Sequence, residues 1–479
     1  MDLSGLNALS LLPELIVAGG GLAALAVHAA GRGRWDRGLD WLAGLVVLAA
    51  TAACLWPPTR EAGYHGTALA DPLAFAGRLL VLVSLLLVLP GGAAYLRQRR
   101  VPLAEYHALT LFAAAGMMAL ASAGDLVLVF LGIEVLSISL YCLAGLLGPR
   151  AASRGAALTY FLTGSYASGF LLFGLALLSG AAGTTRLGGL AAGLAPQLGA
   201  GGQWVALGGA VLMAAGFLFK VGAVPFHAWV PEVYTGSPAP VAAFMSTGAK
   251  AAAFAGFGRV LLPLAGLEPA WAPLLGICAA LTMVLGNFSA LVQGNMRRML
   301  AFSAVAHAGY LLLGLLAAGR QGENLEAVLF YLLPYTLINA ALFLVAARVS
   351  QGGGGRYALE DYQGLARRNP WLAGLLALLL LALAGIPPLA GFLGKFYVFS
   401  AAVHAGHTGL AVLGVLTSVV AVFTYLRPVV YSYFHEPRHE GALPCDAGLL
   451  AALWLAALGV TALGIWPRPW LDLTTGIGL

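Results

Sequence analysis

Long apolar stretches of about 20 residues, separated by short polar links, cover almost the whole chain. Backbone groups at membrane depth must satisfy their hydrogen bonds inside the spanning element, so apolar stretches of this length predict helices rather than barrel strands. We therefore expect an all-helical membrane bundle of about fourteen spans, near residues 11–30, 40–56, 72–94, 103–122, 125–147, 155–180, 203–229, 239–265, 272–292, 299–318, 325–348, 371–403, 408–433 and 447–466.

Two of these spans are interrupted by glycine and proline close to a lysine. Pro225 follows Lys220 in one span, and Pro387-Pro388 precedes Lys395 in the other. A proline inside a helix removes a hydrogen bond, and a broken helix is tolerated at membrane depth where it lines a wet cavity. Paired interruptions of this kind are typical of transporters built from structural repeats.

The repeat divides the chain into four predicted segments. These are an N-terminal three-helix segment over 1–102, five-helix repeats over 103–265 and 272–434, and a C-terminal helix over 446–479. The link 181–202 and the run 352–355 are of low complexity, and we expect both to be flexible surface connections.

Composition and charge agree with a membrane protein. The chain is 60% hydrophobic and 9% charged, with a mean hydropathy of +0.89, which excludes a water-soluble globular domain of this length. Arginines gather in the odd-numbered links, which predicts that these links are cytoplasmic and that both termini face outward. The odd links hold Arg32, Arg34, Arg37, Arg97, Arg99, Arg100, Arg150, Arg154, Arg297, Arg298, Arg348, Arg356, Arg367, Arg368 and Arg438, and the other links and the tail hold Arg60, Arg186, Arg320 and Arg468.

Several classes of function are disfavoured by what the sequence contains. The net charge of +6 follows the topology, and no basic and aromatic pattern indicates a nucleic-acid surface. The first 30 residues lack early basic residues and a small-residue cleavage site, so we expect no removable signal peptide. The cysteines, Cys54, Cys142, Cys278 and Cys445, have no metal or disulfide spacing, so we expect no cofactor, metal or redox centre in this chain.

Lysine usage gives the clearest functional signal. Only Lys220, Lys250 and Lys395 are lysines among the 25 basic residues, and each lies inside a long apolar stretch. A desolvated lysine can lose its proton near neutral pH, whereas arginine stays charged in any protein environment. Titratable amines kept at membrane depth therefore indicate proton handling.

Other polar residues at membrane depth are candidate partners of these lysines. Glu134 lies deep in the fifth span, and we expect it to pair with Lys220, because an unpaired carboxylate there costs roughly 3 kcal/mol. Small residues around Lys250 leave room for water, which would make that amine a relay point. His307 is a candidate proton carrier and His227 a weaker one, although either could be a hydrogen-bonded core group.

Three arginines also lie within predicted spans. Arg78, Arg259 and Arg427 are explained equally well by snorkelling or carbonyl pairing near span ends and by a transport role. The sequence leaves their roles open.

Six motifs carry a resemblance to a known family. They are Glu105-Tyr106-His107-Ala108-Leu109 and the stretches that run from Phe130 to Ser137, Phe219 to Tyr234, Gly248 to Ala251, Arg297 to Tyr310 and Gly385 to Phe396. With them the chain resembles, nearly end to end, the antiporter-like subunits of bacterial proton-pumping NADH:quinone oxidoreductase, respiratory complex I. Within that group it is most similar to subunit N, because subunit M usually has glutamate at the position of Lys395, and a chain ending at Leu479 is expected to lack the lateral helix of subunit L.

The resemblance implies fourteen helices with two inverted five-helix repeats, and it assigns roles to residues. Glu134 would be the fifth-helix carboxylate, Lys220 and Lys395 the amines of the two broken helices, and Lys250 the connecting amine. As the mechanism, we expect Lys250 and His307 to pass the proton through water to Lys395. The implied function is proton translocation from the cytoplasm outward across the bacterial inner membrane, driven by redox chemistry in partner subunits.

The resemblance also implies neighbours in an assembly. Subunits M and K would flank the chain, and the quinone would bind elsewhere in the complex. The alternative is a subunit of a multisubunit cation/proton antiporter, which shares the lysine and glutamate framework without NADH chemistry. A proton-silent scaffold is disfavoured, because an assembly role does not require three buried lysines.

Overall fold

Helices make up nearly all regular structure in the computed structural model, which describes residues 7–31, 36–56, 63–148, 150–196, 203–321, 325–352, 357–438, 441, 443 and 446–474. The α-helices are α1 (Leu12–Gly31), α2 (Asp36–Leu55), α3 (Pro72–Arg97), α4 (Leu103–Ala121), α5 (Leu126–Ala144), α6 (Ala151–Ala182), α7 (Leu187–Leu194), α8 (Gln203–Val221), α9 (Trp229–Gly236), α10 (Ala239–Phe244), α11 (Lys250–Leu261), α12 (Glu268–Leu291), α13 (Met296–Gln321), α14 (Leu325–Gly352), α15 (Leu365–Arg368), α16 (Pro370–Ala384), α17 (Ala390–His404), α18 (Thr408–Phe434), α19 (Ala447–Ile465) and α20 (Arg468–Thr474).

Short irregular helices join or extend these elements. They are the 3₁₀ helices η1 (Ala8–Leu11), η3 (Tyr64–Gly66), η6 (Leu262–Leu267) and η7 (Leu359–Tyr362), and one π-helical turn, η5 (Met245–Ala249), between α10 and α11.

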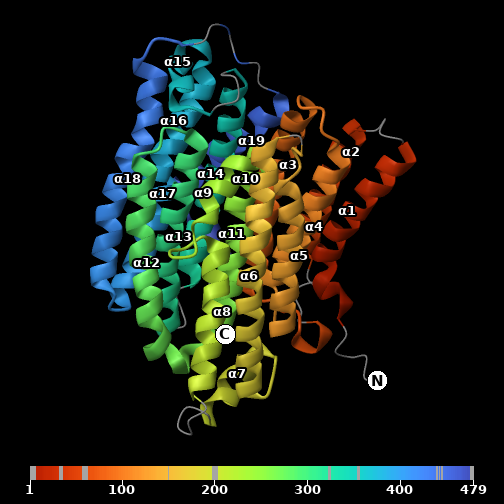
Figure 1. Cartoon of the computed structure of the whole chain (residues 1–479), viewed down its shortest axis with the longest axis vertical. Coiled ribbons are helices and arrows are strands. Elements are labelled where there is room, and N and C mark those ends of the chain that lie inside the picture. The colour runs from red at the N-terminus through yellow and green to blue at the C-terminus, as the bar shows by residue number, and fades with distance from the viewer. Residues whose placement is uncertain are drawn as a thin grey trace.

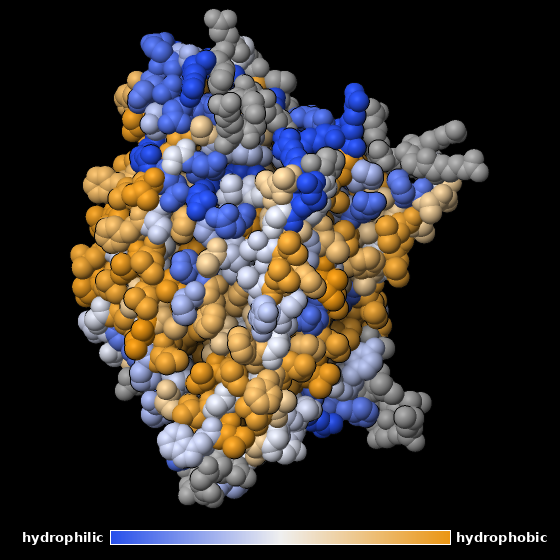
Figure 2. All heavy atoms as spheres, viewed as in Figure 1, coloured by the Kyte–Doolittle hydropathy of each residue, from blue (hydrophilic) through white to orange (hydrophobic). Residues whose placement is uncertain are grey.

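The helices form a multi-pass membrane bundle, as the apolar pattern predicts. Figure 1 shows the long helices running side by side along the long axis, with α1 and α2 at one edge and α18 at the other. In Figure 2 the apolar residues form a broad band around the middle, and hydrophilic residues gather at the end that carries α15 and the basic links. The apolar window of α14 is 100% buried, so α14 forms the centre of the bundle.

The number of spans differs from the sequence-based expectation. In the described part of the chain, 12 helical runs are long and apolar enough to cross a membrane, so the count of fourteen is not confirmed. The run Ala239–Leu291 contains two predicted spans joined through η6, and the 15-residue α16 is shorter than a full span. The link 181–202 was predicted wrongly as flexible, because Leu187, Leu190 and Leu194 bury one face of a helix, α7. Residues 197–202 and 353–355 lie outside the described residues.

Both predicted helix breaks are confirmed. The first separates α8 from α9 and turns at Gly222, and the second separates α16 from α17 and turns at Gly385. Both glycines have positive φ, 75° and 87°, a conformation that glycine adopts without the steric cost of a Cβ. The two lysines are not at matching places: Lys220 lies in the last turn of the helix before its break, whereas Lys395 lies in the helix after its break.

A pair of backbone hydrogen bonds recurs in the two halves of the bundle. At the start of α5, Leu126 N donates to Thr185 O and Leu187 N donates to Gly124 O, at 2.9 and 3.0 Å. At the start of α13, Met296 N donates to Tyr357 O and Leu359 N donates to Gly294 O, at 2.8 and 2.9 Å. The same local bridge thus begins the second helix of each expected five-helix repeat.

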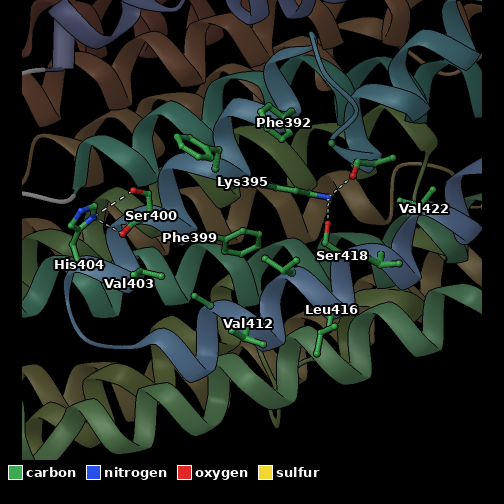
Figure 3. A pocket seen from close by; sticks show the side chains of 16 residues that line it. Phe392, Lys395, Phe399, Ser400, Val403, His404, Val412, Leu416, Ser418 and Val422 are labelled. Carbon is green, nitrogen blue, oxygen red and sulfur yellow. Dashed lines mark hydrogen bonds between the residues drawn. The ribbon is translucent and has the colours of Figure 1, made fainter.

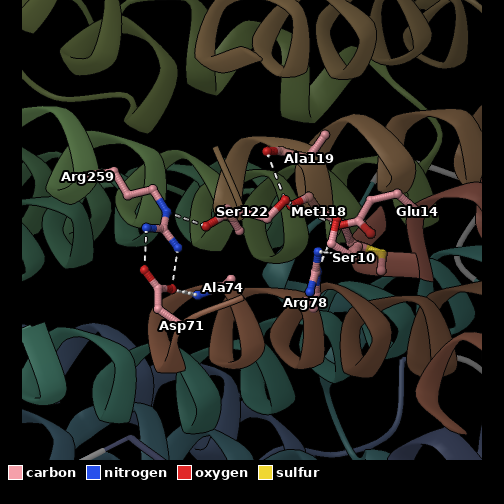
Figure 4. A network of polar contacts seen from close by, with 10 residues as sticks. Ser10, Glu14, Asp71, Ala74, Arg78, Met118, Ala119, Ser122 and Arg259 are labelled. Atoms are coloured by element: carbon pink, nitrogen blue, oxygen red, sulfur yellow. Dashed lines mark hydrogen bonds and ion pairs between the residues drawn. The ribbon is translucent and has the colours of Figure 1, made fainter. Parts of the chain in front are cut away.

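Two buried arginines tie the N-terminal helices to the first five-helix range and to each other (Figure 4). Arg259 of α11 is fully buried and donates to both carboxylate oxygens of Asp71 at 2.7 and 2.5 Å, and to Ala121 O at 2.5 Å. Arg78 of α3 donates to Glu14 of α1 at 2.7 Å and to Ser10 O at 2.8 Å. Both arginines are therefore held by ion pairs and carbonyls instead of snorkelling.

Arg427 pairs with backbone carbonyls, one of the roles considered from the sequence. It donates to Leu291 O at 2.5 Å and to Gln293 O at 3.1 Å. Its guanidinium thereby covers carbonyls at the C-terminal end of α12, where a helix leaves its last acceptors without intrahelical donors.

Candidate proton-relay site

The amine of Lys220 is buried at the end of α8 among hydroxyl groups. It donates to Ser137 Oγ of α5 at 2.7 Å and to Tyr160 OH of α6 at 3.3 Å, and it lies 5.3 Å from the Tyr160 ring centre. Trp229, the first residue of α9, stacks on Tyr160 at 4.6 Å and donates to Phe219 O at 3.0 Å. Trp229 therefore fixes both sides of the break around the amine.

Glu134 does not make the expected direct pair with Lys220. It is half-buried, it accepts a hydrogen bond from Ser168 at 2.5 Å, and no ion pair joins it to Lys220 in the described structure. The reason is the position of Glu134 on α5. Ser137, one turn further along this helix, accepts the hydrogen bond of the Lys220 amine, whereas Glu134 lies beside the exposed residues Leu131 and Val135. The expected contact is wrong, and any influence of Glu134 on Lys220 acts through space.

Lys250 begins α11 directly after the π-helical turn. Its buried amine donates to Ala304 O of α13. Ser84 of α3 holds the turn from the side: its hydroxyl lies 2.6 Å from Thr247 Oγ1 and accepts from Gly248 N at 3.2 Å. A π-turn changes the direction of the side chains that follow it, and such turns are frequent at functional sites.

His307 lies between Lys250 and Lys395 within a group of tyrosines. Its Nδ1 is 2.5 Å from Tyr331 OH, and its Nε2 is 3.1 Å from Tyr425 OH. Tyr335 lies 5.2 Å from the His307 ring and 5.8 Å from the Lys250 amine, and Tyr310 lies 5.7 Å from that ring and 5.6 Å from the Lys395 amine. The sequence-predicted order of Lys250, His307 and Lys395 therefore matches their order in space.

A small cavity of about 10 Å³ lies beside His307. Tyr331 and Tyr335 line one side, and Leu383, Gly391 and Gly394 of the second broken helix line the other. A cavity of that volume holds about one water molecule. It lies where a water molecule could bridge the tyrosine cluster and the broken helix.

The amine of Lys395 is anchored at the second break. It donates to Ala384 O, at the end of α16, at 2.8 Å and to Ser418 Oγ of α18 at 2.7 Å. Figure 3 shows the amine beside a cavity between α17 and α18 whose volume is about 700 Å³. Phenylalanines and branched aliphatic residues form most of the wall, and Ser400 and His404 add polar groups.

The structure brings together more residues than the sequence indicates. The five predicted residues are buried or half-buried at membrane depth, and their hydrogen-bond partners are hydroxyl groups and backbone carbonyls. The hydroxyl partners are Ser137, Tyr160, Ser168, Tyr331, Ser418 and Tyr425, and the carbonyl partners are those of Ala304 and Ala384. The rings of Tyr310 and Tyr335 lie close to the amines of Lys395 and Lys250. Only Tyr331 and Tyr335 carried a sequence signal, the helical i, i+4 spacing of two tyrosines. His227 lies in the first break and joins none of these hydrogen-bonded groups among the described contacts.

In the residues that the structure describes, no three or more His, Cys, Asp or Glu side chains are placed to hold a metal ion. Cys142 and Cys278 are free thiols in the part of the chain that the structure describes, Cys54 is buried, and Cys445 lies outside the described residues.

Comparisons with known proteins agree with this geometry. Residues 123–421 match a family model described as "NADH:quinone oxidoreductase/Mrp antiporter, TM". "NADH-quinone oxidoreductase subunit N 2" of Roseiflexus castenholzii is 42% identical, with 91% of this chain and 89% of that protein covered. "NADH-quinone oxidoreductase subunit N" of Trichlorobacter lovleyi is 40% identical, with coverages of 95% and 94%.

Solved structures have the same fold. A chain of respiratory complex I from Thermus thermophilus with bound aureothin has a TM-score of 0.82 and 34% identity, covering 98% of this chain and 100% of that one. A chain of the Mrp complex from Dietzia has a TM-score of 0.82 and 25% identity, covering 97% and 96%. The lysines of the broken helices, the tyrosine cluster and these likenesses lead to one conclusion: the chain belongs to the antiporter-like membrane subunits of NADH-quinone oxidoreductase, in the subunit N family.

Proposed function

We propose that this chain translocates protons as a membrane-arm subunit of an NADH:quinone oxidoreductase. The observation that carries the proposal is the setting of its three lysines. Each amine is buried, and each donates to hydroxyl or carbonyl oxygens instead of a carboxylate. An ion pair would fix an amine in its charged form, whereas neutral acceptors allow both the charged and the neutral form.

The relay runs from Lys220 through Lys250 and His307 to Lys395. Glu134 stands at its beginning, at the half-buried face of α5, and acts on the positive charge of Lys220 without touching it. His307 carries the proton between the two later lysines, because its two ring nitrogens contact different tyrosine hydroxyls. Lys395 releases the proton outward against a membrane potential of roughly 2.3 kcal/mol per charge per 100 mV.

The energy for this transfer comes from redox chemistry in partner subunits, and this chain contributes no redox centre. Its neighbours are other complex I subunits, and we propose subunits M and K as the two that flank it. The odd-numbered links lie in the cytoplasm, so that both termini face outward from a bacterial inner membrane. Support comes from the gathering of hydrophilic residues at one end of the molecule (Figure 2).

A second candidate function is cation/proton exchange in a multisubunit antiporter. The likeness to a chain of the Dietzia Mrp complex favours it specifically. Identities of 40% and 42% to subunit N proteins favour the oxidoreductase more strongly.

The test is NADH-driven acidification of inverted membrane vesicles that contain the assembled complex. Lys220→Ala is expected to abolish acidification while the complex stays assembled, because no other amine is held by Ser137 and Tyr160. Normal acidification in this variant would refute the relay. Sodium-dependent proton exchange without NADH, lost in the same variant, would instead establish the antiporter.

A further inference from the structure

A second large cavity lies outside the relay, between α2, α3 and α19, at the end of the bundle that carries the basic links. Its volume is about 850 Å³. At that end of the three helices, the cavity is lined by Asp40, Arg97, Gln98 and Asp446. Deeper in the bundle, it is lined by Val47, Leu85 and Leu89. The cavity is therefore polar at one end and apolar at the other.

The dimensions of this cavity match one leaflet of a membrane. Along α3, the lining residues extend from Leu85 to Arg97, about 18 Å at the rise of an α-helix. Half the hydrocarbon core of a bilayer is roughly 15 Å thick. An acyl chain lying along Leu85 and Leu89 would thus place its headgroup beside Arg97.

Small side chains keep the cavity open. An added Cβ at Gly44 of α2 would meet no atom within 4 Å, and Gly44 lines the cavity. Ala94, Ala447 and Ala451 also contribute to the wall. Trp41, 78% exposed at the same end of α2, has the position of an interfacial anchor.

The charges at the polar end favour a zwitterion over an anion. Arg97 pairs with Asp40, which also lies 3.0 Å from His107 Nε2. Asp446 is the N-cap residue of α19 but makes no side-chain cap hydrogen bond, and it is exposed. Among the described residues that line the cavity, two carboxylates and one guanidinium repel a purely anionic headgroup and attract a headgroup that also carries a cation.

We propose that this cavity binds a phospholipid with a primary ammonium headgroup, of the phosphatidylethanolamine class. The phosphate lies beside Arg97 and Gln98, the ammonium group donates hydrogen bonds to Asp446, and an acyl chain fills the apolar part. A choline headgroup has no N–H to donate, and a glycerol headgroup leaves the carboxylates without a cation.

Native mass spectrometry of the purified complex tests the site. The complex is delipidated, returned to vesicles of phosphatidylethanolamine, phosphatidylglycerol or phosphatidylcholine, and assayed for lipid that stays with this subunit. We expect retained phosphatidylethanolamine in the wild type, loss in Gly44→Phe, and roughly tenfold weaker retention in Asp446→Asn, as one charged hydrogen bond disappears. Gly19→Phe is the matched control, because Gly19 is exposed on α1 and an added Cβ also meets nothing within 4 Å.

Three results would overturn the proposal. Equal retention of phosphatidylethanolamine in Gly44→Phe and the wild type would show that lipid does not occupy the cavity. Preferred retention of phosphatidylglycerol would show that the carboxylates do not select the headgroup. Absence of retained lipid together with failed assembly of Gly44→Phe, but not of Gly19→Phe, would assign the cavity to a neighbouring subunit.

Discussion

At the scale of single residues, the acceptors of the lysine amines decide what those amines can do. Ser137 and Tyr160 hold Lys220, Ala304 O holds Lys250, and Ala384 O and Ser418 hold Lys395. Hydrogen bonds to a charged group contribute roughly 1.5–3 kcal/mol each, less than the cost of burying the charge. These groups position an amine without fixing its charge.

Removal of one acceptor should therefore change proton transfer more than stability. Ser137→Ala is expected to slow NADH-driven acidification about tenfold, because the Lys220 amine loses its 2.7 Å acceptor. Ser139→Ala is the matched control, since Ser139 lies on the same helix and its hydroxyl bonds only to Val135 O at 2.9 Å in the described structure. Equal rates in the two variants would mean that Ser137 has no part in the relay.

At the scale of elements, the broken helices bring backbone polar groups to membrane depth. At the second break, α16 ends at Ala384 and its carbonyl accepts from the Lys395 amine. Gly385 follows with φ of 87°, and its open side faces the lysine: an added Cβ would lie 3.0 Å from Lys395 Cδ and 3.3 Å from Nζ. Glycine at position 385 thus allows the left-handed turn and also leaves room for the Lys395 side chain.

Gly385→Ala should impair pumping by displacing that amine. The left-handed conformation itself costs an alanine roughly 1–2 kcal/mol, so a control with the same strain is needed. Gly441→Ala provides it, because Gly441 has φ of 83° and an added Cβ there meets no atom within 4 Å. Vesicle acidification should fall severalfold in Gly385→Ala and stay normal in Gly441→Ala, and a similar fall in both would indicate backbone strain alone.

At the scale of the whole molecule, an ion pair with a buried arginine joins the N-terminal helices to α11, which carries Lys250. Asp71, the N-cap residue of α3, pairs with the fully buried Arg259 of α11. Burial alone would raise the pKa of Asp71, but the hydrogen bonds and charge of Arg259 and the Ala74 amide hold that pKa below its usual value. A carboxyl group with a lowered pKa stabilises the fold above its unfolded pKa, and this contribution disappears as the pH falls through the folded pKa.

Asp71→Asn should consequently destabilise the protein by roughly 3 kcal/mol at neutral pH, because Arg259 keeps its charge without a counterion. Asparagine can still cap α3 through Ala74 N, so the change isolates the ion pair. The measurement is heat-induced release of this subunit from the purified complex. The difference from the wild type should be constant from pH 7 to about pH 5 and shrink only below about pH 4, whereas an unchanged difference at low pH would contradict this account.

Part of the site could be predicted because its residues conflict with their surroundings. A charged side chain at membrane depth has an unfavourable free energy, so the sequence alone marks four residues as functional candidates: Lys220, Lys250, Lys395 and Glu134. Tyr160 and Ser137 could not be found this way, because hydroxyl side chains are common in membrane helices and bury at little cost once hydrogen-bonded. The direct pairing of Glu134 and Lys220 was predicted wrongly, because charge complementarity does not tell which neutral groups lie closer to the Lys220 amine than Glu134 does.

The sequence by itself determined the class of protein, the two breaks and the candidate lysines, because hydropathy, proline, glycine and buried charge act locally along the chain. Only the tertiary structure decided which oxygen atom each amine contacts. It also decided that His307 lies between Tyr335, which is close to the Lys250 amine, and Tyr310, which is close to the Lys395 amine. The contacts between amines and oxygens join residues up to 83 positions apart, as Ser137 and Lys220 do. Helix packing sets them, and the packing depends on the complementary shapes of whole helix surfaces, which no local pattern encodes.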